Sequence, residues 1–439
     1  MISTIILVLI VVIAYLFASL SNVYGEVAID PDDNLIISNE TIDPLNQFNF
    51  GKWAFPLLAT NFFLLGVGIL YQKNKIPEKI QNFIKFIFEF EVSQKIALLV
   101  IATLLTLYVG FSVGELQHEE TLGDYPGVKE AAENWSFENL TIGGTNIRYF
   151  LLNVSLNIFD NIRVIPFIAS ISLLILIYFI TFEISKKRFA GIVAMVIVLQ
   201  SNLFLQYDTI ATYTNFWTLF YLSSLYLIYK SWFLSPIFYV LSIFSKPLTT
   251  IFLPMTLFFT YRADITKRKK ILTLISYGII VFFGIAAYLL GIWDTHYDGF
   301  YPDGFLTGFK EFSNFLQSDG LITLFLLPLV VRLFIASRKG VQQAESLMVL
   351  IAGILLSAPL LGGLTLLTNQ PYRFIPLVVF FAIGVGIILS RNNVYGQHAH
   401  KKGRLASYLV FSVTLTIVLV TLLSVIFPSL IQGQYRIVL

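Results

Sequence analysis

Cysteine is absent from this 439-residue chain, and histidine occurs at only four positions, 118, 296, 398 and 400. Without thiols the protein has no disulfide, no thiolate metal site and no cysteine nucleophile. Charged residues make up 13% of the chain, about half the proportion in a soluble domain. The net charge of +3 is small, and no basic stripe alternates with aromatic residues as in a nucleic-acid groove. We therefore expect no nucleic-acid partner.

The motifs of several common enzyme classes are also missing. The chain has no G-x-x-x-x-G-K-[ST] phosphate loop, no G-x-G-x-x-G sequence after a strand, no H-E-x-x-H zinc motif and no G-x-S-x-G nucleophile elbow. These absences direct attention to the hydrophobic residues, which form 56% of the chain and give it a mean hydropathy of +0.78. The composition is typical of an integral membrane protein.

Apolar runs of spanning length predict an all-α, polytopic architecture. Eleven such runs occur, at 1–20, 53–71, 94–114, 163–183, 189–207, 213–229, 271–291, 321–337, 346–367, 372–390 and 406–427. A twelfth run, 233–261, has 29 residues, too many for one upright helix and too few for two full ones. Its topology decides the orientation of every later segment.

That run contains SIFSKPLTTIFLPM, in which Lys246 precedes Pro247. A charge at membrane depth costs at least about 2.5 kcal/mol, so a lysine at this position is expected to have a structural or functional role. If the run is a hairpin that turns at Lys246, 21 of the 29 basic residues lie on the cytoplasmic side and eight lie outside or near the outer face. A single kinked helix would instead move twelve of them outside. The hairpin is favoured, because short cytoplasmic loops collect Lys and Arg.

The hairpin gives about thirteen hydrophobic segments, or twelve if the first is cleaved as a signal peptide. We divide the chain into an appendage at 1–92, with two transmembrane segments and an interfacial helix, and a main module at 93–439. The large loops 115–162 and 292–320 then lie on the extracytoplasmic side, where we expect the functional site. We expect the protein in the plasma membrane.

Candidate acidic residues gather in the first of these loops. Glu115, Glu119, Glu120 and Asp124 follow the helix at 94–114 within ten residues. Carboxylates held where a helix ends are suited to take a proton from a hydroxyl group. The alternative is a solvated acidic loop. Asp208, in the outer turn DTIATYTN, is a second candidate, and its alternative role is an N-cap for the following helix.

Two of the eight basic residues that this topology leaves outside or near the outer face are candidate anion ligands, Lys246 and Arg373. The hairpin halves 233–245 and 248–261 are each about 20 Å long, shorter than the hydrocarbon core of about 30 Å, so the turn should lie below the outer surface. An ammonium beside a half-helix N-terminus forms an anion site. Snorkelling is the alternative for Lys246, and an interfacial anchor with Tyr372 is the alternative for Arg373. Facing the carboxylates, the two cations would hold a leaving phosphate while a carboxylate activates the attacking hydroxyl.

The order of these features resembles the GT-C superfamily of membrane glycosyltransferases, such as the protein mannosyltransferases and aminoarabinose transferases. The resemblance spans about 93–391. It rests on the acidic loop GELQHEETLGDYPG at 114–127, the helix–loop–helix at 190–230, YVLSIFSKPLTTIFLPMTLFF at 239–259 and PYRFIPLVVFFAIG at 371–384. The family's loop acid is commonly an Asp-Glu pair near the helix end. Here Glu119-Glu120 is the nearest pair, with Asp124 and Glu115 as competitors.

The resemblance implies transfer of a sugar, with inversion, from a polyprenyl-phosphate donor to a protein, lipid or glycan acceptor in contact with membrane lipid. In this interpretation a loop carboxylate is the general base, and Lys246 with Arg373 stabilises the leaving phosphate. Asp208 orients the acceptor or a divalent metal ion, a cofactor that the sequence leaves open. Tyr125, Tyr207 and Trp293 are candidates to stack on the sugar, and the alternative for each is a place in the interfacial aromatic belt. A transporter or flippase of a lipid-linked or anionic substrate, and a non-catalytic subunit of a membrane complex, are the alternatives.

Overall fold

The computed structural model describes residues 75–137, 145–290, 319–365 and 371–390, with a few positions between 59 and 70 and at 304, 305 and 308. All regular secondary structure in these ranges is helical. Six helices there are long and apolar enough to cross a membrane, which is compatible with an integral membrane protein: 94–117, 164–185, 267–286, 320–338, 344–363 and 371–388. The runs 1–20 and 406–427, more than half of 53–71 and most of the loop 292–320, Trp293 included, lie outside the described residues, so the total of thirteen segments stays a prediction.

The helices follow one another as expected from the apolar runs. Each of the eight runs predicted between 94 and 390 outside the hairpin coincides with helix. The elements, in order, are α3 (Glu78–Glu89), α4 (Gln94–Ser112), η2 (Val113–Gln117), α5 (Tyr125–Glu133), α6 (Asn146–Phe159), α7 (Val164–Ser185), α8 (Arg188–Leu199), α9 (Asn202–Tyr207), α10 (Phe216–Lys230), α11 (Leu234–Ser245), η4 (Pro247–Phe252), α12 (Leu253–Arg262), α13 (Lys267–Leu289), α15 (Gly320–Arg338), α16 (Ala344–Thr365), η5 (Pro371–Phe374) and α17 (Ile375–Ile388).

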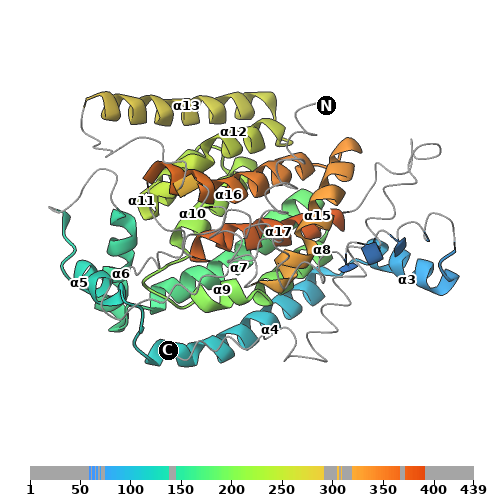
Figure 1. The fold of residues 1–439 in the computed structure, drawn as a ribbon, viewed down its shortest axis with the longest axis horizontal. Helices are drawn as coiled ribbons and strands as arrows, with labels where there is room; N and C mark the ends of the chain where they lie inside the picture. The colour runs from blue at the N-terminus through green and yellow to red at the C-terminus, as the bar shows by residue number, and fades with distance from the viewer. Residues whose placement is uncertain are drawn as a thin grey trace, which may run out of the picture.

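Helix α17 forms the centre of the bundle, between α7, α8, α15 and α16 (Figure 1). All of its residues are buried. Close packing depends on glycine, because a Cβ added to Gly386 would lie 2.4 Å from Thr181 Cγ2 and 2.9 Å from the Ala190 carbonyl oxygen. Helices α4 and α13 run along opposite edges of the bundle and leave apolar side chains such as Leu99 and Phe282 exposed (Figure 1). Such faces are suited to lipid.

The chain reverses at Lys246, as predicted. Tyr239 Oη donates to the Thr249 carbonyl oxygen at 2.9 Å, and Ser242 Oγ lies 3.2 Å from Thr249 Oγ1. Residues seven and ten positions apart cannot meet in this way within one helix, which rises 1.5 Å per residue. Lys246 is extended, with φ of −155°, because the following proline disfavours helical geometry. The hairpin is therefore confirmed.

The returning arm of the hairpin reaches the end of the bundle at which α10 ends. Gln343 Nε2 donates to Tyr229 Oη at 2.7 Å and to the Phe259 carbonyl oxygen at 3.2 Å, which joins α10, α12 and the start of α16. The predicted inner turns therefore meet at one end of the bundle.

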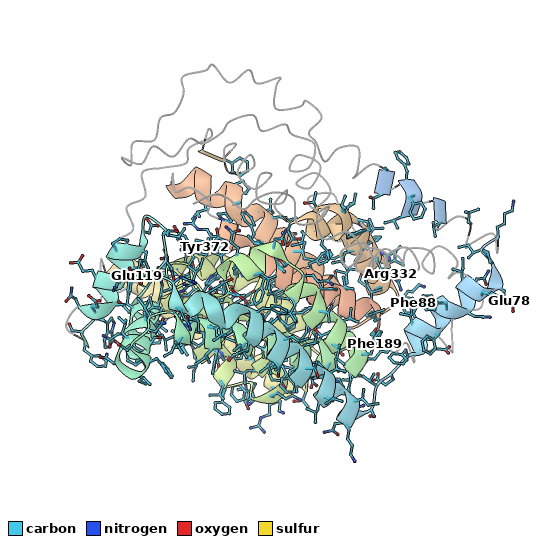
Figure 2. The ribbon with its side chains drawn as sticks, turned by 90° about the horizontal axis from the view of Figure 1, so that it is seen from below. Glu78, Phe88, Glu119, Phe189, Arg332 and Tyr372 are labelled. Atoms are coloured by element: carbon cyan, nitrogen blue, oxygen red, sulfur yellow. The ribbon has the colours of Figure 1, made fainter. Side chains whose placement is uncertain are left out.

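The two ends of the bundle carry different charges. At the end just described, Lys230 pairs with Glu183 at 2.6 Å, and the buried Lys187 donates to the Phe88 carbonyl oxygen at 2.8 Å, which ties α3 to the bundle. Phe88 and Phe189 lie at this end, and Glu119 and Tyr372 at the other (Figure 2). The structure separates the basic turns from the acidic loop, and the assignment of the basic end to the cytoplasm stays a prediction.

Candidate functional site

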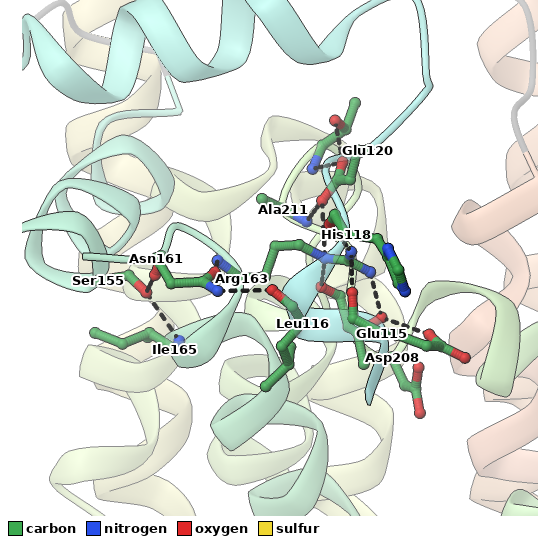
Figure 3. Close-up of polar contacts among 12 residues, drawn as sticks. Glu115, Leu116, His118, Glu120, Ser155, Asn161, Arg163, Ile165, Asp208 and Ala211 are labelled. Atoms are coloured by element: carbon green, nitrogen blue, oxygen red, sulfur yellow. Dashed lines mark hydrogen bonds and ion pairs between the residues drawn. The ribbon is translucent and has the colours of Figure 1, made fainter. Parts of the chain in front are cut away.

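Arg163 organises the acidic end of the bundle. It lies at the N-cap of α7 and is buried. Its Nη1 donates to the carbonyl oxygens of Glu115 and His118, the latter at 2.6 Å (Figure 3). Its Nε donates to the Thr209 carbonyl oxygen at 3.0 Å, and its Nη2 donates to Thr209 Oγ1 at 2.8 Å. One guanidinium thus joins the acidic loop after α4 to the loop after α9.

Glu120 supports this second loop from the other side. Its carboxylate accepts hydrogen bonds from the backbone N–H of Ala211, from the backbone N–H of Thr212 at 3.1 Å and from Thr212 Oγ1 at 2.6 Å. Arg163 Nε lies 3.7 Å from Glu120 Oε1, and the Glu120 side chain is 3% exposed. A carboxylate with its oxygens so occupied holds the loop in place and has little capacity to receive an acceptor's proton.

A Glu120→Gln variant should therefore unfold more easily. The glutamine would turn an amide NH₂ toward backbone donors and leave Arg163 without its counter-charge, at a cost of about 3 kcal/mol. We expect a clearly lower Tm for the detergent-solubilised protein. Glu119→Gln at the neighbouring position is the control, because Glu119 is 78% exposed and pairs only with the exposed Lys129 at 3.1 Å. Equal Tm values for the two variants would contradict this role of Glu120.

Glu115 and Asp208 form the acid pair of the site. Thr209 Oγ1 donates to Glu115 Oε2 at 2.9 Å (Figure 3). Ser112 Oγ donates to Asp208 Oδ2 at 3.2 Å. Asp208 is buried, and this burial, together with the charge of Glu115, raises its pKa to about 7. A carboxyl group with this pKa can accept and release a proton near neutral pH.

Asp208 does not cap the next helix. The N-cap of α10 is Asn215, so the alternative role for Asp208 is wrong. Its backbone oxygen instead accepts from Ser170 Oγ at 2.7 Å, which fixes the turn after α9. The buried carboxylate accepts from Ser112 Oγ and interacts with Tyr108 and Glu115.

The remaining candidates of the acidic loop face other partners. Glu119 points into solvent. Asp124 accepts from Tyr213 Oη at 2.7 Å. Tyr125 packs into a small core with Val128 and Leu152 and also lines a cavity of about 160 Å³ between η2, α5 and the turn after α6. The structure thus brings Glu115 to Asp208 and separates both from Glu119.

Tyr372 brings the two predicted cations together. Lys246 Nζ donates to Tyr372 Oη and lies 4.8 Å from the centroid of its ring. Arg373 Cζ lies 5.9 Å from the same centroid. The two charges are therefore at most 10.7 Å apart, the sum of these distances. The Lys246 ammonium lies against a phenol oxygen and is not extended into water, which disfavours snorkelling.

Arg148, near the start of α6, is a third cation of this region. Its Nη2 donates to the Thr212 carbonyl oxygen and, at 3.5 Å, to that of Ala211. Arg148 and Arg373 both act electrostatically on the Lys246 ammonium. Across the described ranges, none of the three cations has a carboxylate within 4.0 Å.

Several donor atoms of these arginines are also unused. Nε and Nη1 of Arg373 and Nε of Arg148 are buried, and none has a hydrogen-bond partner among the residues that the structure describes. Buried donors without partners are costly, which indicates that a ligand supplies acceptors. An anion with several oxygens, such as a phosphate group, fits this requirement.

Three tyrosines lie between the acids and the cations. Tyr213 stacks on Tyr372 with centroids 4.5 Å apart, and Tyr207 lies 6.0 Å from each of them. Because Tyr213 also bonds to Asp124, the rings connect the acidic loop to Lys246. The sequence predicts Tyr207 beside a sugar, and the structure places Tyr213 and Tyr372 in contact with it.

Sequence reasoning missed Arg148 and Arg163. Both belong to the eight basic residues that the hairpin topology leaves outside or near the outer face. The same outer location singled out Lys246 and Arg373, so it could also have identified Arg148 and Arg163 as candidates. It did not reveal that Arg163 is structural whereas Arg148 joins the cations.

No group of three His, Asp or Glu side chains is arranged to hold a metal ion within the described ranges. Glu115 and Asp208 are the pair that could contribute oxygen ligands there. Comparison with protein-family models, with curated proteins and with solved structures finds no match. The resemblance to GT-C enzymes therefore rests on the sequence motifs alone.

Proposed function

We propose that the protein is a membrane glycosyltransferase of GT-C type. It moves a sugar from a polyprenyl-phosphate carrier to a protein, lipid or glycan acceptor on the extracytoplasmic side. One observation carries the proposal. Lys246 and Arg373 have no carboxylate partner within the described ranges, and they meet at Tyr372 at the end of the bundle that also holds the Glu115–Asp208 pair.

The reaction places one group on each side of the sugar. The Glu115–Asp208 pair takes the proton from the acceptor hydroxyl, and the acceptor oxygen attacks the anomeric carbon. The bond between this carbon and the phosphate oxygen breaks, and its electron pair stays on the phosphate. Lys246 and Arg373 stabilise that charge. Attack opposite the leaving group inverts the anomeric configuration.

The structure favours Glu115 with Asp208 as the base over the other loop acids. Glu120 is occupied by loop donors, and Glu119 pairs with Lys129. Glu115, by contrast, is exposed but acts on the buried Asp208. Asp124, hydrogen-bonded to Tyr213, is better placed to orient the ring against which the sugar packs. Tyr207 and Tyr213 provide that aromatic surface.

Transfer of label tests the proposal. The full-length protein in lipid nanodiscs is incubated with radiolabelled polyprenyl-linked sugars and with membrane and protein acceptor fractions, and label in the acceptor is counted. We expect transfer by the wild type and transfer that is about 10²- to 10³-fold slower by the Lys246→Met variant. If the wild type transfers no label from any donor but moves a lipid-linked sugar across vesicles, the transporter alternative replaces the proposal.

A further inference from the structure

The site collects more positive charge than one phosphate requires. Lys246 and Arg373 flank Tyr372, and Arg148 approaches from α6, so three elements distant in sequence deliver one cation each. Clustered like charges repel one another, and a bound anion relieves this repulsion.

Several other cations of the described ranges have carboxylate partners, whereas the buried Lys187 donates to backbone carbonyl oxygens. Arg163 pairs with Glu120, Lys230 with Glu183 at 2.6 Å, and Arg262 with Glu345 at 2.8 Å. The cluster of Arg148, Lys246 and Arg373 has only phenol and carbonyl oxygens as partners in the part of the chain that the structure describes. The arrangement therefore leaves about three positive charges for a ligand.

Charge distinguishes two kinds of lipid donor. A sugar linked to the lipid through one phosphate carries about one negative charge and leaves a lipid monophosphate of about two. A sugar linked through a diphosphate carries about two and leaves a lipid diphosphate of up to about three. Only the second matches three cations, and its additional oxygens can accept from the unused donors of Arg148 and Arg373.

We propose that the donor is a polyprenyl-diphosphate sugar, in which Lys246 and Arg373 bind one phosphate group and Arg148 binds the other. The proposal rests on the glycosyltransfer function proposed above. The bond from the anomeric carbon to the diphosphate breaks, its electron pair stays on the diphosphate oxygen, and the proton of the acceptor goes to the Glu115–Asp208 pair. Arg148 is thus a substrate-binding residue.

Short-chain lipids provide the test. Farnesyl diphosphate and farnesyl monophosphate are titrated into the detergent-solubilised full-length protein, and their Kd values are measured calorimetrically. We expect the diphosphate to bind at least about tenfold more tightly, because one further charge-assisted interaction forms. Arg148→Gln should weaken diphosphate binding about tenfold and change monophosphate binding by less than about threefold.

Two further variants keep the result interpretable. Lys129→Gln removes an exposed cation of the neighbouring α5 and should leave both Kd values unchanged. Arg148→Lys retains the charge without the planar fork and should lose less diphosphate affinity than Arg148→Gln, so it serves if the glutamine variant fails to fold. Inorganic pyrophosphate should bind more weakly than farnesyl diphosphate, and equal binding would overturn recognition of a lipid carrier.

Equal wild-type affinity for the two farnesyl lipids, or an equal loss of both in Arg148→Gln, would overturn the inference. Its failure is separable from that of the function itself. If label is transferred from monophosphate donors only, the diphosphate inference falls and the glycosyltransferase proposal stands. If label is transferred from neither donor class, the glycosyltransferase proposal falls.

Discussion

Lys246→Met should reduce kcat/KM for sugar transfer by about 10²- to 10³-fold. Methionine keeps the unbranched apolar stem, so packing of the hairpin turn is largely preserved while the ammonium is lost. That ammonium lies 4.8 Å from the centroid of Tyr372, in a setting with little water and no carboxylate within the described ranges. Its attraction for a departing phosphate is therefore weakly screened. Initial rates with a labelled donor measure the effect.

Matched variants separate charge from structure in this experiment. Lys246→Arg retains a cation and should recover part of the rate. Lys230→Met removes a lysine at the opposite end of the bundle, where it pairs with Glu183, and should leave the rate near that of the wild type. If Lys246→Met transfers sugar at the wild-type rate and is equally stable, Lys246 is not a phosphate ligand.

Asp208→Asn should lower kcat by about 10²- to 10⁴-fold if the Glu115–Asp208 pair is the general base. The pKa of Asp208 is raised to about 7 by burial and by Glu115. Only the carboxylate accepts a proton, so the wild-type rate should rise with pH and level off above about pH 7. The asparagine variant should lack this rise. A pH–rate profile from pH 5 to 9 shows the difference.

Glu115→Gln provides the companion result. It removes a negative charge that raises the pKa of Asp208, so the rise in rate should shift to lower pH. Asp124→Asn, whose partner is Tyr213, should retain the wild-type pH midpoint. If Asp124→Asn abolishes the rise while Asp208→Asn keeps it, the base has been assigned to the wrong carboxylate.

Asp208 also links stability to pH. Its folded-state pKa lies above the ordinary aspartate value of 3.8, so the folded state holds the proton more tightly than the unfolded state. Stability from this group is fully present below pH 3.8 and is lost as the pH rises to about 7. Relative to the wild type, Asp208→Asn should therefore gain Tm between pH 5 and pH 8. Measurement of Tm across this interval tests the assignment independently of activity.

The hairpin is a feature that the sequence pattern predicted correctly. Its length, its proline and the distribution of basic residues predicted a reversal at Lys246, and the contacts of Tyr239 and Ser242 with Thr249 confirm it. Charge distribution and segment length depend on the membrane and not on packing partners, so both can be read along the chain.

The acidic loop shows what the sequence pattern could not predict. Four carboxylates within ten residues are equivalent in sequence, yet Glu119 lies in water, Glu120 holds a loop 90 residues away, and Glu115 lies beside Asp208. The same holds for the cations, because nothing in their spacing predicts that Tyr372 would bring Lys246 to Arg373.

The lengths of the apolar runs and the distribution of charged residues were sufficient for the helical architecture, the reversal at Lys246 and the end of the bundle at which the acids and cations gather. These properties follow from the preference of each segment for lipid or water. That preference is the sum of the hydrophobicities of its individual residues, so it can be read from the sequence. The choice of Glu115 with Asp208, the structural role of Arg163 and the addition of Arg148 to the cations came only from the tertiary structure. Burial and partners set the pKa and availability of each charged group, and both arise from chain segments that meet only in the folded protein.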